Sequence, residues 1–334
     1  MKVIIPVAGF GTRLRPHTLL HPKVLMTVAG KPMIYFIVEQ IIKEKISNHI
    51  VFVVGYLGDR IEKYILKEFV HNKDIKFEFL VQDEPKGLGH AVHCAKPAFT
   101  DDDKEAFIIL GDTLFDVDLK KLVSNDLSVI GVKKVDDPRR FGVVETNNDK
   151  IITRLVEKPA SKEVSPSNDA IVGLYYIKNS DNLFGALEYI FKNEIKTKDE
   201  YQLTDALAKM IADGKKMTTY DVQGWLDCGK IETILETNAY LLDKLYANKN
   251  YEFENTIIMA PVYIADGCKI KNCTIGPNVS ISKDCIIENT IIKNSIVNDK
   301  CEIDNSEIND SLVGFNCKVK NYKGTMTLGD YSEV

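Results

Sequence analysis

The sequence predicts an α/β domain built on a largely parallel sheet, followed by a parallel β-helix. Over the first hundred or so residues apolar strands alternate with amphipathic helices, which is typical of a parallel sheet with helices on both faces. Beyond about residue 253 an aliphatic residue recurs every five or six positions, with small and polar residues between. That period is too short for helical repeats and too regular for a sandwich, and it fits a β-helix. We expect domains at residues 1–238 and 256–334, joined by a linker helix and connection at 239–255.

Composition narrows the class of protein. The chain has 334 residues, of which 45% are hydrophobic and 27% charged, as in ordinary globular proteins with a sizeable core. The net charge of −5 argues against a nucleic-acid partner. No stretch approaches the roughly 18 apolar residues of a membrane helix. Pro6 and the glycines interrupt the first apolar run, so we do not expect that run to be a signal peptide. Seven cysteines without a C-x-x-C pair disfavour zinc and a disulfide framework, so we expect a cytoplasmic protein without a membrane partner.

Hydrophobic periodicity places the elements of the first domain. Strands are expected in the run from Val3 to the first glycine, and at 50–54, 75–81, 106–110, 127–132, 143–145, 151–156, 171–177 and 217–222. Helices are expected at 33–46, from Asp59 as N-cap to about 69, and at 91–95, 181–192, 203–213 and 231–245. The strand-rich middle makes the sheet mixed, in a Rossmann-like arrangement.

In the second domain each repeat predicts one inward side chain. The expected core positions are Ile264, Ile270, Ile275, Ile281, Ile287, Ile292, Val297, Ile303, Ile308, Val313 and Val319. Five cysteines, Cys268, Cys273, Cys285, Cys301 and Cys317, lie within these repeats. We interpret them as small buried or corner side chains rather than as metal ligands or redox groups.

The loop that leaves the first strand is a candidate phosphate site. Gly9 and Gly11 allow a sharp turn and a close approach of backbone to a ligand, and Arg13 follows directly. Free N–H groups in such a loop, with a cation beside them, suit a polyphosphate. Lys23 can add charge to the same anion. The alternative is a tight strand-to-helix turn that binds nothing.

Two aspartates complete a candidate magnesium site. Asp112 follows the strand at 106–110, and Asp227 follows the strand at 217–222. In a parallel sheet ligands bind at the carboxyl ends of strands, where the opening loop also lies. Mg²⁺ takes one or two carboxylates together with substrate phosphates, so these residue types suit a Mg²⁺–polyphosphate complex. The alternative for each aspartate is an ordinary turn.

These motifs, in this order, resemble the sugar-1-phosphate nucleotidyltransferases, and the resemblance covers nearly all of the first 240 residues. The residues that carry it are Gly9–Pro16, Pro22-Lys23, Gly30–Met33, Gln82, Pro85–Ala91, Leu110–Asp112, Phe141–Glu145, Glu157–Pro159, Gly173–Tyr175 and Trp225–Gly229. The repeat tail resembles the left-handed β-helix of longer members. Thr113 and Cys228-Gly229-Lys230 depart from the more frequent pattern and leave the sugar open.

The resemblance implies a role for each matching residue. The nucleotide would be wrapped by Ala8, Gly9, Gly11, Thr12 and Arg13, with Lys23 neutralising the phosphates, Gln82 on the pyrimidine edge and Gly87 near the base. The sugar 1-phosphate would be held by Gly142, Glu157, Gly173 and Lys158, and Mg²⁺ by Asp112 and Asp227. His90, in the base loop, is more simply a packing or hydrogen-bonding residue than a catalytic one.

The implied reaction is attack of a sugar 1-phosphate, most simply glucose 1-phosphate, on UTP or dTTP, with release of pyrophosphate. Uracil and thymine differ by one methyl group, so the base stays open. Two alternatives remain: a GTP:mannose-1-phosphate guanylyltransferase, and a non-catalytic regulatory or assembly subunit. An additional acyltransferase activity is disfavoured because no histidine follows His93. We expect the β-helix to serve oligomerisation or regulation, and the protein to be a homo-oligomer.

Overall fold

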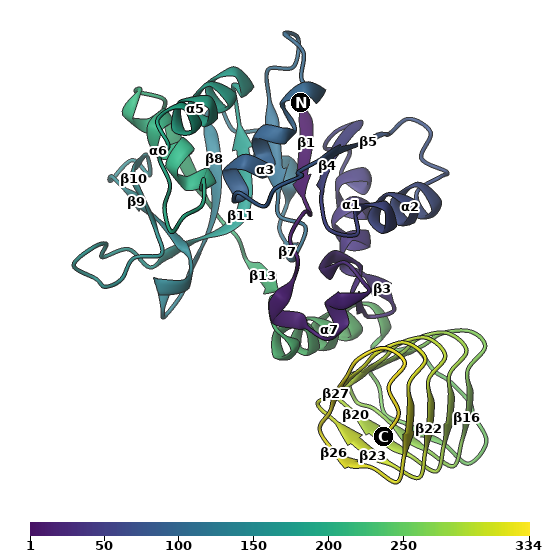
Figure 1. Cartoon of the computed structure of the whole chain (residues 1–334). Helices are drawn as coiled ribbons and strands as arrows, with labels where there is room; N and C mark the ends of the chain where they lie inside the picture. Colours follow the sequence, from purple (N-terminus) through teal and green to yellow (C-terminus); the bar gives the residue numbers. More distant parts are fainter. The chain divides into compact units, whose positions relative to one another are not determined.

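The structure, a computed structural model, describes residues 1–334 and divides into two units (Figure 1). The first unit consists of residues 1–9 and 37–225, and the second of residues 10–36 and 226–334. The segment that follows the first strand is therefore grouped with the β-helix, although it is distant from it in sequence.

A nine-stranded mixed sheet forms the first unit, as predicted. Its main path runs β10-β9-β11-β6-β1-β4-β5, and β8 pairs with β11 and β12. β1, β4, β5 and β6 are parallel, whereas β11 is antiparallel to β6 and β8. The strands are β1 (Lys2–Pro6), β4 (His49–Val54), β5 (Lys76–Val81), β6 (Ala106–Ile109), β8 (Ser128–Lys134), β9 (Gly142–Thr146), β10 (Ile152–Glu157), β11 (Asp169–Ile177) and β12 (Met217–Asp221). Two short strands, β7 (Thr113–Asp116) and β13 (Gly224–Asp227), were not predicted.

Both faces of the central strands are buried, which explains their continuous apolar runs. Ile4, Val51 and Ile108 belong to a core that includes side chains of α3, α5 and α6. Their neighbours Ile5 and Phe52 point to the opposite face and are also fully buried. The helices are α1 (Met33–Lys43), α2 (Gly58–Glu68), α3 (Leu88–Cys94), α4 (Leu119–Val123), α5 (Ser180–Lys192), α6 (Leu203–Ala212) and α7 (Ile231–Tyr246).

Three helix boundaries differ from the prediction by more than one residue. α1 ends at Lys43 rather than at residue 46, and Lys45 has a φ of 52° that no helix continues through. Asp59 is not the N-cap of α2, because Leu57 occupies that position in left-handed conformation. Asp59 lies in the first turn instead, where the helix dipole favours a carboxylate. α3 begins at Leu88, three residues before the expected start, because Gly87 forms its N-cap.

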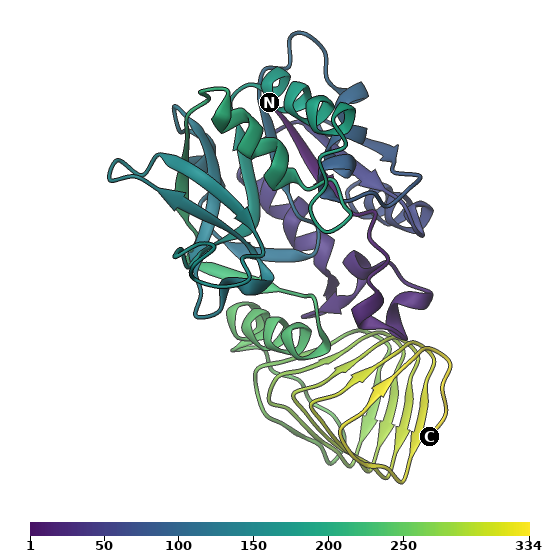
Figure 2. The ribbon, with the colours of Figure 1, turned by 60° about the vertical axis from the view of Figure 1, so that its left-hand side comes forward.

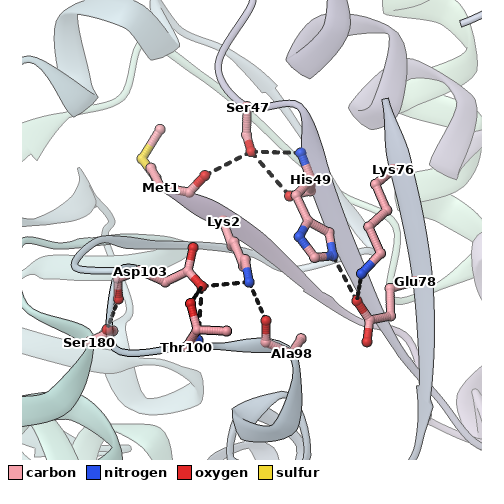
Figure 3. Close-up of polar contacts among 10 residues, drawn as sticks. All are labelled: Met1, Lys2, Ser47, His49, Lys76, Glu78, Ala98, Thr100, Asp103 and Ser180. Carbon is pink, nitrogen blue, oxygen red and sulfur yellow. Dashed lines mark hydrogen bonds and ion pairs between the residues drawn. The ribbon is translucent and has the colours of Figure 1, made fainter. Parts of the chain in front are cut away.

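Hydrogen bonds and ion pairs between polar side chains connect the amino ends of the central strands to neighbouring segments (Figure 3). Lys2 Nζ lies 2.6 Å from Asp103 Oδ2, and the same carboxylate oxygen accepts from the backbone N–H and the hydroxyl of Thr100, both at 2.8 Å. On the neighbouring strands His49 Nε2 and Glu78 Oε2 lie 2.8 Å apart. This network is at the edge of the sheet opposite to the strand ends that the predicted site uses.

A parallel β-helix with three sheets forms most of the second unit (Figure 2). The strand orders are β14-β17-β20-β23-β26, β15-β18-β21-β24-β27 and β16-β19-β22-β25. The strands are β14 (Ile257–Ile258), β15 (Val262–Ile264), β16 (Lys269–Lys271), β17 (Thr274–Ile275), β18 (Val279–Ile281), β19 (Ile286–Glu288), β20 (Ile291–Lys293), β21 (Ile296–Val297), β22 (Glu302–Asp304), β23 (Glu307–Asn309), β24 (Leu312–Val313), β25 (Lys318–Lys320), β26 (Lys323–Gly324) and β27 (Thr327–Leu328). The tail is the left-handed β-helix that the resemblance implied.

The core of the β-helix follows the predicted repeat. All eleven predicted aliphatic positions are buried, and equivalent residues such as Ile281, Val297 and Val313 stack in register on successive coils. Asparagines turn one corner in left-handed conformation, and Asn272 Nδ2 donates to Asn289 Oδ1 of the next coil at 3.0 Å. All seven cysteines are free, and four of the five in the repeats are buried.

Helix α7 joins the segment 10–36 to the β-helix inside the second unit. Asn238 on α7 is fully buried, and its Oδ1 accepts from the backbone N–H of Ala29 at 2.8 Å and from Ser280 Oγ at 2.6 Å. Ala29 lies in a hairpin of β2 (Thr27–Val28) and β3 (Lys31–Pro32). No helix of the chain combines the length and the apolar character that crossing a membrane requires.

Candidate functional site

The loop after β1 folds back on itself around Gly11. This glycine has a φ of 63°, a conformation that favours glycine. Its carbonyl accepts a hydrogen bond from Thr18 Oγ1 at 2.8 Å. A Cβ at Gly11 would lie 3.0 Å from Thr18 Cγ2 and 3.1 Å from Lys23 Cβ. The close contact therefore brings Lys23, at the start of the 3₁₀ helix η3 (Lys23–Leu25), against the glycine loop.

Arg13 and Asp227 meet at Gly229 in the same unit. A Cβ at Gly229 would lie 3.0 Å from Asp227 Oδ1 and 3.4 Å from Arg13 Nη2. Arg13 is exposed in the 3₁₀ helix η1 (Thr12–Leu14), and Asp227 is the last residue of β13. The second unit thus gathers Gly11, Thr12, Arg13, Lys23 and Asp227.

In the first unit Asp112 lies at the carboxyl edge of the sheet, as the parallel topology predicts. It follows β6 in the turn before β7, and Thr113 Oγ1 donates to its Oδ1 at 3.4 Å. A Cβ at the preceding Gly111 would lie 2.4 Å from Val7 Cγ1. Asp112 is therefore next to the point where the chain leaves β1 through Ala8 and Gly9.

Gln82 and Gly87 form a small hydrogen-bonded group with His90. Gln82 is buried, and its Nε2 lies 3.2 Å from the carbonyl oxygen of Gly87 and 3.0 Å from His90 Nδ1. The amide can donate to Nδ1 only when that nitrogen is unprotonated, and burial together with the charge of Lys86 lowers the pKa of His90. His90 therefore fixes the orientation of the Gln82 amide, which agrees with the hydrogen-bonding role expected for it.

Gly87 is required by the fold as well as by any ligand. Its φ is 106°, and a Cβ there would lie 2.7 Å from the carbonyl oxygen of Tyr201 and 2.9 Å from Glu200 Cβ. Gly173 is similar, since a Cβ would lie 2.6 Å from Leu110 Cδ1. Close packing alone explains why both positions are glycines.

A carboxylate and an ammonium group adjoin each other at the end of β10. Glu157 pairs with Gly142 across the β9–β10 ladder, and a Cβ at Gly142 would lie 3.0 Å from Glu157 Oε2. Thr204 Oγ1 donates to Glu157 Oε2 at 3.0 Å, and Lys158 Nζ lies 3.1 Å from Glu157 Oε1. Lys158 has a φ of 47°, and its N–H donates to the carbonyl of Phe141 at 3.0 Å.

The structure divides the predicted site residues between the two units and adds partners that the sequence did not reveal. The first unit holds Ala8, Gly9, Gln82, Gly87, Asp112, Gly142, Glu157, Lys158 and Gly173. Thr204 was missed because it is 47 residues from Glu157, on α6. Thr18 was missed because a lone threonine between motifs carries no sequence signal of its own. The binding roles of all these residues remain predictions.

Two protein-family models match this chain. The family model described as "Nucleotidyl transferase" matches residues 2–244, and the model described as "GMPPB C-terminal domain" matches residues 255–330. The chain is 36% identical over 277 residues to the "Bifunctional protein GlmU" of Methanococcus maripaludis, covering 81% of this chain and 62% of that protein. It thus spans about three fifths of the length of this relative.

Two further matches extend the comparison. The "Glucose-1-phosphate thymidylyltransferase" of Streptomyces griseus is 27% identical over 321 residues, covering 89% of this chain and 87% of that protein. Among solved structures, a UDP-glucose pyrophosphorylase complexed with UDP-glucose superposes with a TM-score of 0.60 and 26% identity, covering 73% of this chain and 98% of that one.

Proposed function

This chain belongs to the nucleotidyl transferase family, and on that premise we propose that it condenses UTP or dTTP with a sugar 1-phosphate to give a nucleoside diphosphate sugar and pyrophosphate. We propose glucose 1-phosphate as the sugar substrate. A thymidylyltransferase and a UDP-glucose pyrophosphorylase among the similar proteins support a pyrimidine nucleotide and glucose. The chain is also similar to a protein named GlmU and matches the GMPPB C-terminal domain model, so the substrate has to be tested directly.

The group at the end of β10 carries this proposal. Glu157 Oε2 accepts from Thr204, and Lys158 Nζ is 3.1 Å from the other oxygen, Oε1. A sugar 1-phosphate carries hydroxyl donors next to an anion. The carboxylate would accept from the hydroxyls, and the ammonium group would bind the phosphate in a charge-assisted contact. Gly142 keeps the space beside the carboxylate free of a side chain.

The nucleotide would bind to two sets of residues. Gln82, oriented by His90, would contact the polar edge of the base. Arg13 and Lys23 would neutralise the triphosphate, supported by the N–H groups of the loop from Ala8 to Thr12. A triphosphate needs cations on several oxygens, which accounts for two basic residues close to one glycine loop.

Asp112 and Asp227 are the residues that would hold Mg²⁺. The donor set fits this ion, because both side chains are carboxylates, whose oxygens are the hard ligands that Mg²⁺ takes. A cation that keeps waters and substrate phosphates needs only one or two carboxylates. When bound, Mg²⁺ supplies charge neutralisation at the reacting phosphates.

The proposed reaction is an in-line substitution at the α-phosphorus of the nucleotide. An oxygen of the sugar phosphate forms the new bond, the bond between the α-phosphorus and the bridging oxygen breaks, and the electron pair leaves with pyrophosphate. A phosphate monoester is already ionised near neutral pH, so no general base is required. Arg13, Lys23 and Lys158 would hold two mutually repelling anions together and stabilise the developing charge.

Pyrophosphate release from UTP or dTTP with glucose 1-phosphate and Mg²⁺ tests the proposal. We expect turnover in the wild type, and a loss of at least 100-fold in Arg13→Ala and in the double variant Asp112→Ala, Asp227→Ala. Turnover with GTP and mannose 1-phosphate alone would favour the guanylyltransferase alternative. Inactivity with every pair would favour a non-catalytic subunit. Near-normal turnover in the double variant would remove the metal assignment.

A further inference from the structure

The last coils of the β-helix contact the segment that carries the predicted phosphate loop (Figure 2). The ring of His21 stacks on Phe315, with centroids 4.3 Å apart and planes 26° from parallel. His21 Nε2 lies 3.2 Å from Asp330 Oδ2. Asp330 is only 4% exposed at its side chain. A nearly buried carboxylate at the end of the chain thus reaches a residue close to its beginning.

Asp330 also bonds to the preceding coil. Its Oδ1 accepts from the backbone N–H of Phe315 at 2.9 Å. One carboxylate therefore fixes Phe315 with one oxygen and His21 with the other. Beside it, a Cβ at Gly329 would lie 2.9 Å from Pro16 Cγ and 3.0 Å from Pro16 Cβ. The coil approaches the loop segment so closely that no larger residue fits at Gly329 without movement.

A short path of contacts leads from this surface to the phosphate loop. Between Pro16 and His21 lies the 3₁₀ helix η2 (His17–Leu19), in which His17 and Thr18 are buried. Burial lowers the pKa of His17 to about 4, so the imidazole is neutral at pH 7 and packs without charge. Thr18 Oγ1 donates to the carbonyl of Gly11, two residues before Arg13. The loop is thus supported from η2, and η2 is supported from the β-helix.

We propose that Asp330, with Phe315 and His21, is a positioning residue for the nucleotide-binding loop. The β-helix then contributes to the transferase site itself, by holding η2 and through it the Gly11–Arg13 turn. The consequence for the reaction rests on the proposed function. Binding geometry at a phosphate depends on fractions of an ångström, so loosening the support would weaken catalysis although no group that touches substrate is altered.

A matched control comes from the same corner of the β-helix, two coils earlier. Asp299 Oδ1 accepts from the backbone N–H of Lys283 at 3.1 Å, in the way that Asp330 accepts from Phe315. Asp330→Ala and Asp299→Ala therefore remove similar bonds from the β-helix, but only Asp330 pairs with His21. Gly329→Ala is a second perturbation that presses on Pro16 and removes no polar group.

Kinetics distinguish positioning from general destabilisation. We expect Asp330→Ala and Gly329→Ala to lower kcat/KM for the nucleotide about 10-fold, mainly through KM, while KM for the sugar phosphate stays within about 2-fold. Asp299→Ala should lose comparable thermal stability and keep kcat/KM within about 2-fold. Equal kinetic losses in Asp330→Ala and Asp299→Ala, or wild-type kinetics in Asp330→Ala, would overturn the proposal.

Hydrogen exchange separates this inference from the proposed function. Asp330→Ala should speed amide exchange in residues 10–23 at least 10-fold relative to Asp299→Ala, whether or not a substrate pair has been found. Unchanged exchange in that segment would refute the positioning role even in an active enzyme. If exchange rises but the wild type turns over no nucleotide, the support of the loop stands and the proposed function fails.

Discussion

Thr204→Val tests the orientation of the Glu157 carboxylate. The substitution keeps the shape of the side chain and removes the hydroxyl that donates to Glu157 Oε2 at 3.0 Å. Thr204 is 6% exposed, so water cannot readily replace the hydroxyl. A hydrogen bond to a charged group contributes about 1.5–3 kcal/mol, and Lys158 still restrains the other oxygen, so we take about 1.5–2 kcal/mol. That corresponds to a loss of about 10- to 30-fold in kcat/KM.

The assay is pyrophosphate release with each substrate varied in turn. The loss should appear against the sugar 1-phosphate and leave KM for the nucleotide unchanged, because Glu157 is assigned to the sugar. Thr204→Ser is the control, since it keeps the hydroxyl and loses only a methyl group, and its kcat/KM should stay within about 3-fold of wild type. Wild-type kinetics in Thr204→Val, or an equal loss in Thr204→Ser, would refute the reasoning.

Three further predictions concern stability and packing. Gly142→Ala should cost about 1–3 kcal/mol of unfolding free energy and raise KM for the sugar 1-phosphate, because the added Cβ would lie 3.0 Å from Glu157 Oε2. Denaturation measures the first effect and steady-state kinetics the second. An unchanged KM would contradict the assignment of Glu157 to the sugar. Burial alone would raise the pKa of Asp103, but hydrogen bonds from Lys2 and Thr100 lower it to about 2 (Figure 3). The ionised carboxylate therefore contributes about 1–2 kcal/mol of unfolding free energy above pH 3.8, and this contribution is lost as the pH falls toward 2. Asp103→Asn should remove that acid dependence from denaturation curves. The pKa of His17 is lowered from 6.5 to about 4, so the unfolded chain takes up a proton at a higher pH than the folded protein does. The unfolding free energy should therefore fall by up to about 3 kcal/mol as the pH drops from 6.5 toward 4. His17→Gln should flatten this pH dependence, and an unchanged dependence would contradict the assignment to His17.

The β-helix was predictable residue by residue. Each coil must point one aliphatic side chain of each strand inward, so the repeat in the sequence directly encodes the fold, from Ile264 to Val319. The parallel strands were predictable for a related reason, since burial on both faces produces continuous apolar runs such as residues 50–54 of β4.

What the sequence could not predict depends on contacts between distant residues. Nothing local to His21 indicates that Asp330 will lie 3.2 Å away, so the association of residues 10–36 with the β-helix was not foreseen. The start of α3 was misplaced because glycine commonly follows the end of a helix, whereas Gly87 here caps the start of one. The candidate site residues come from motifs, and their roles stay predictions. A hydrogen-bond partner such as Thr204, which lies 47 residues from Glu157, depends on tertiary packing that no motif reveals.

The most direct test of the central claim is an activity matrix of nucleoside triphosphates against sugar 1-phosphates with Mg²⁺, in which both the pyrophosphate and the nucleoside diphosphate sugar are quantified. We predict equimolar products, highest with UTP or dTTP and glucose 1-phosphate, and none without Mg²⁺. No nucleoside diphosphate sugar from any pair would contradict the claim that this chain is an active sugar-1-phosphate nucleotidyltransferase.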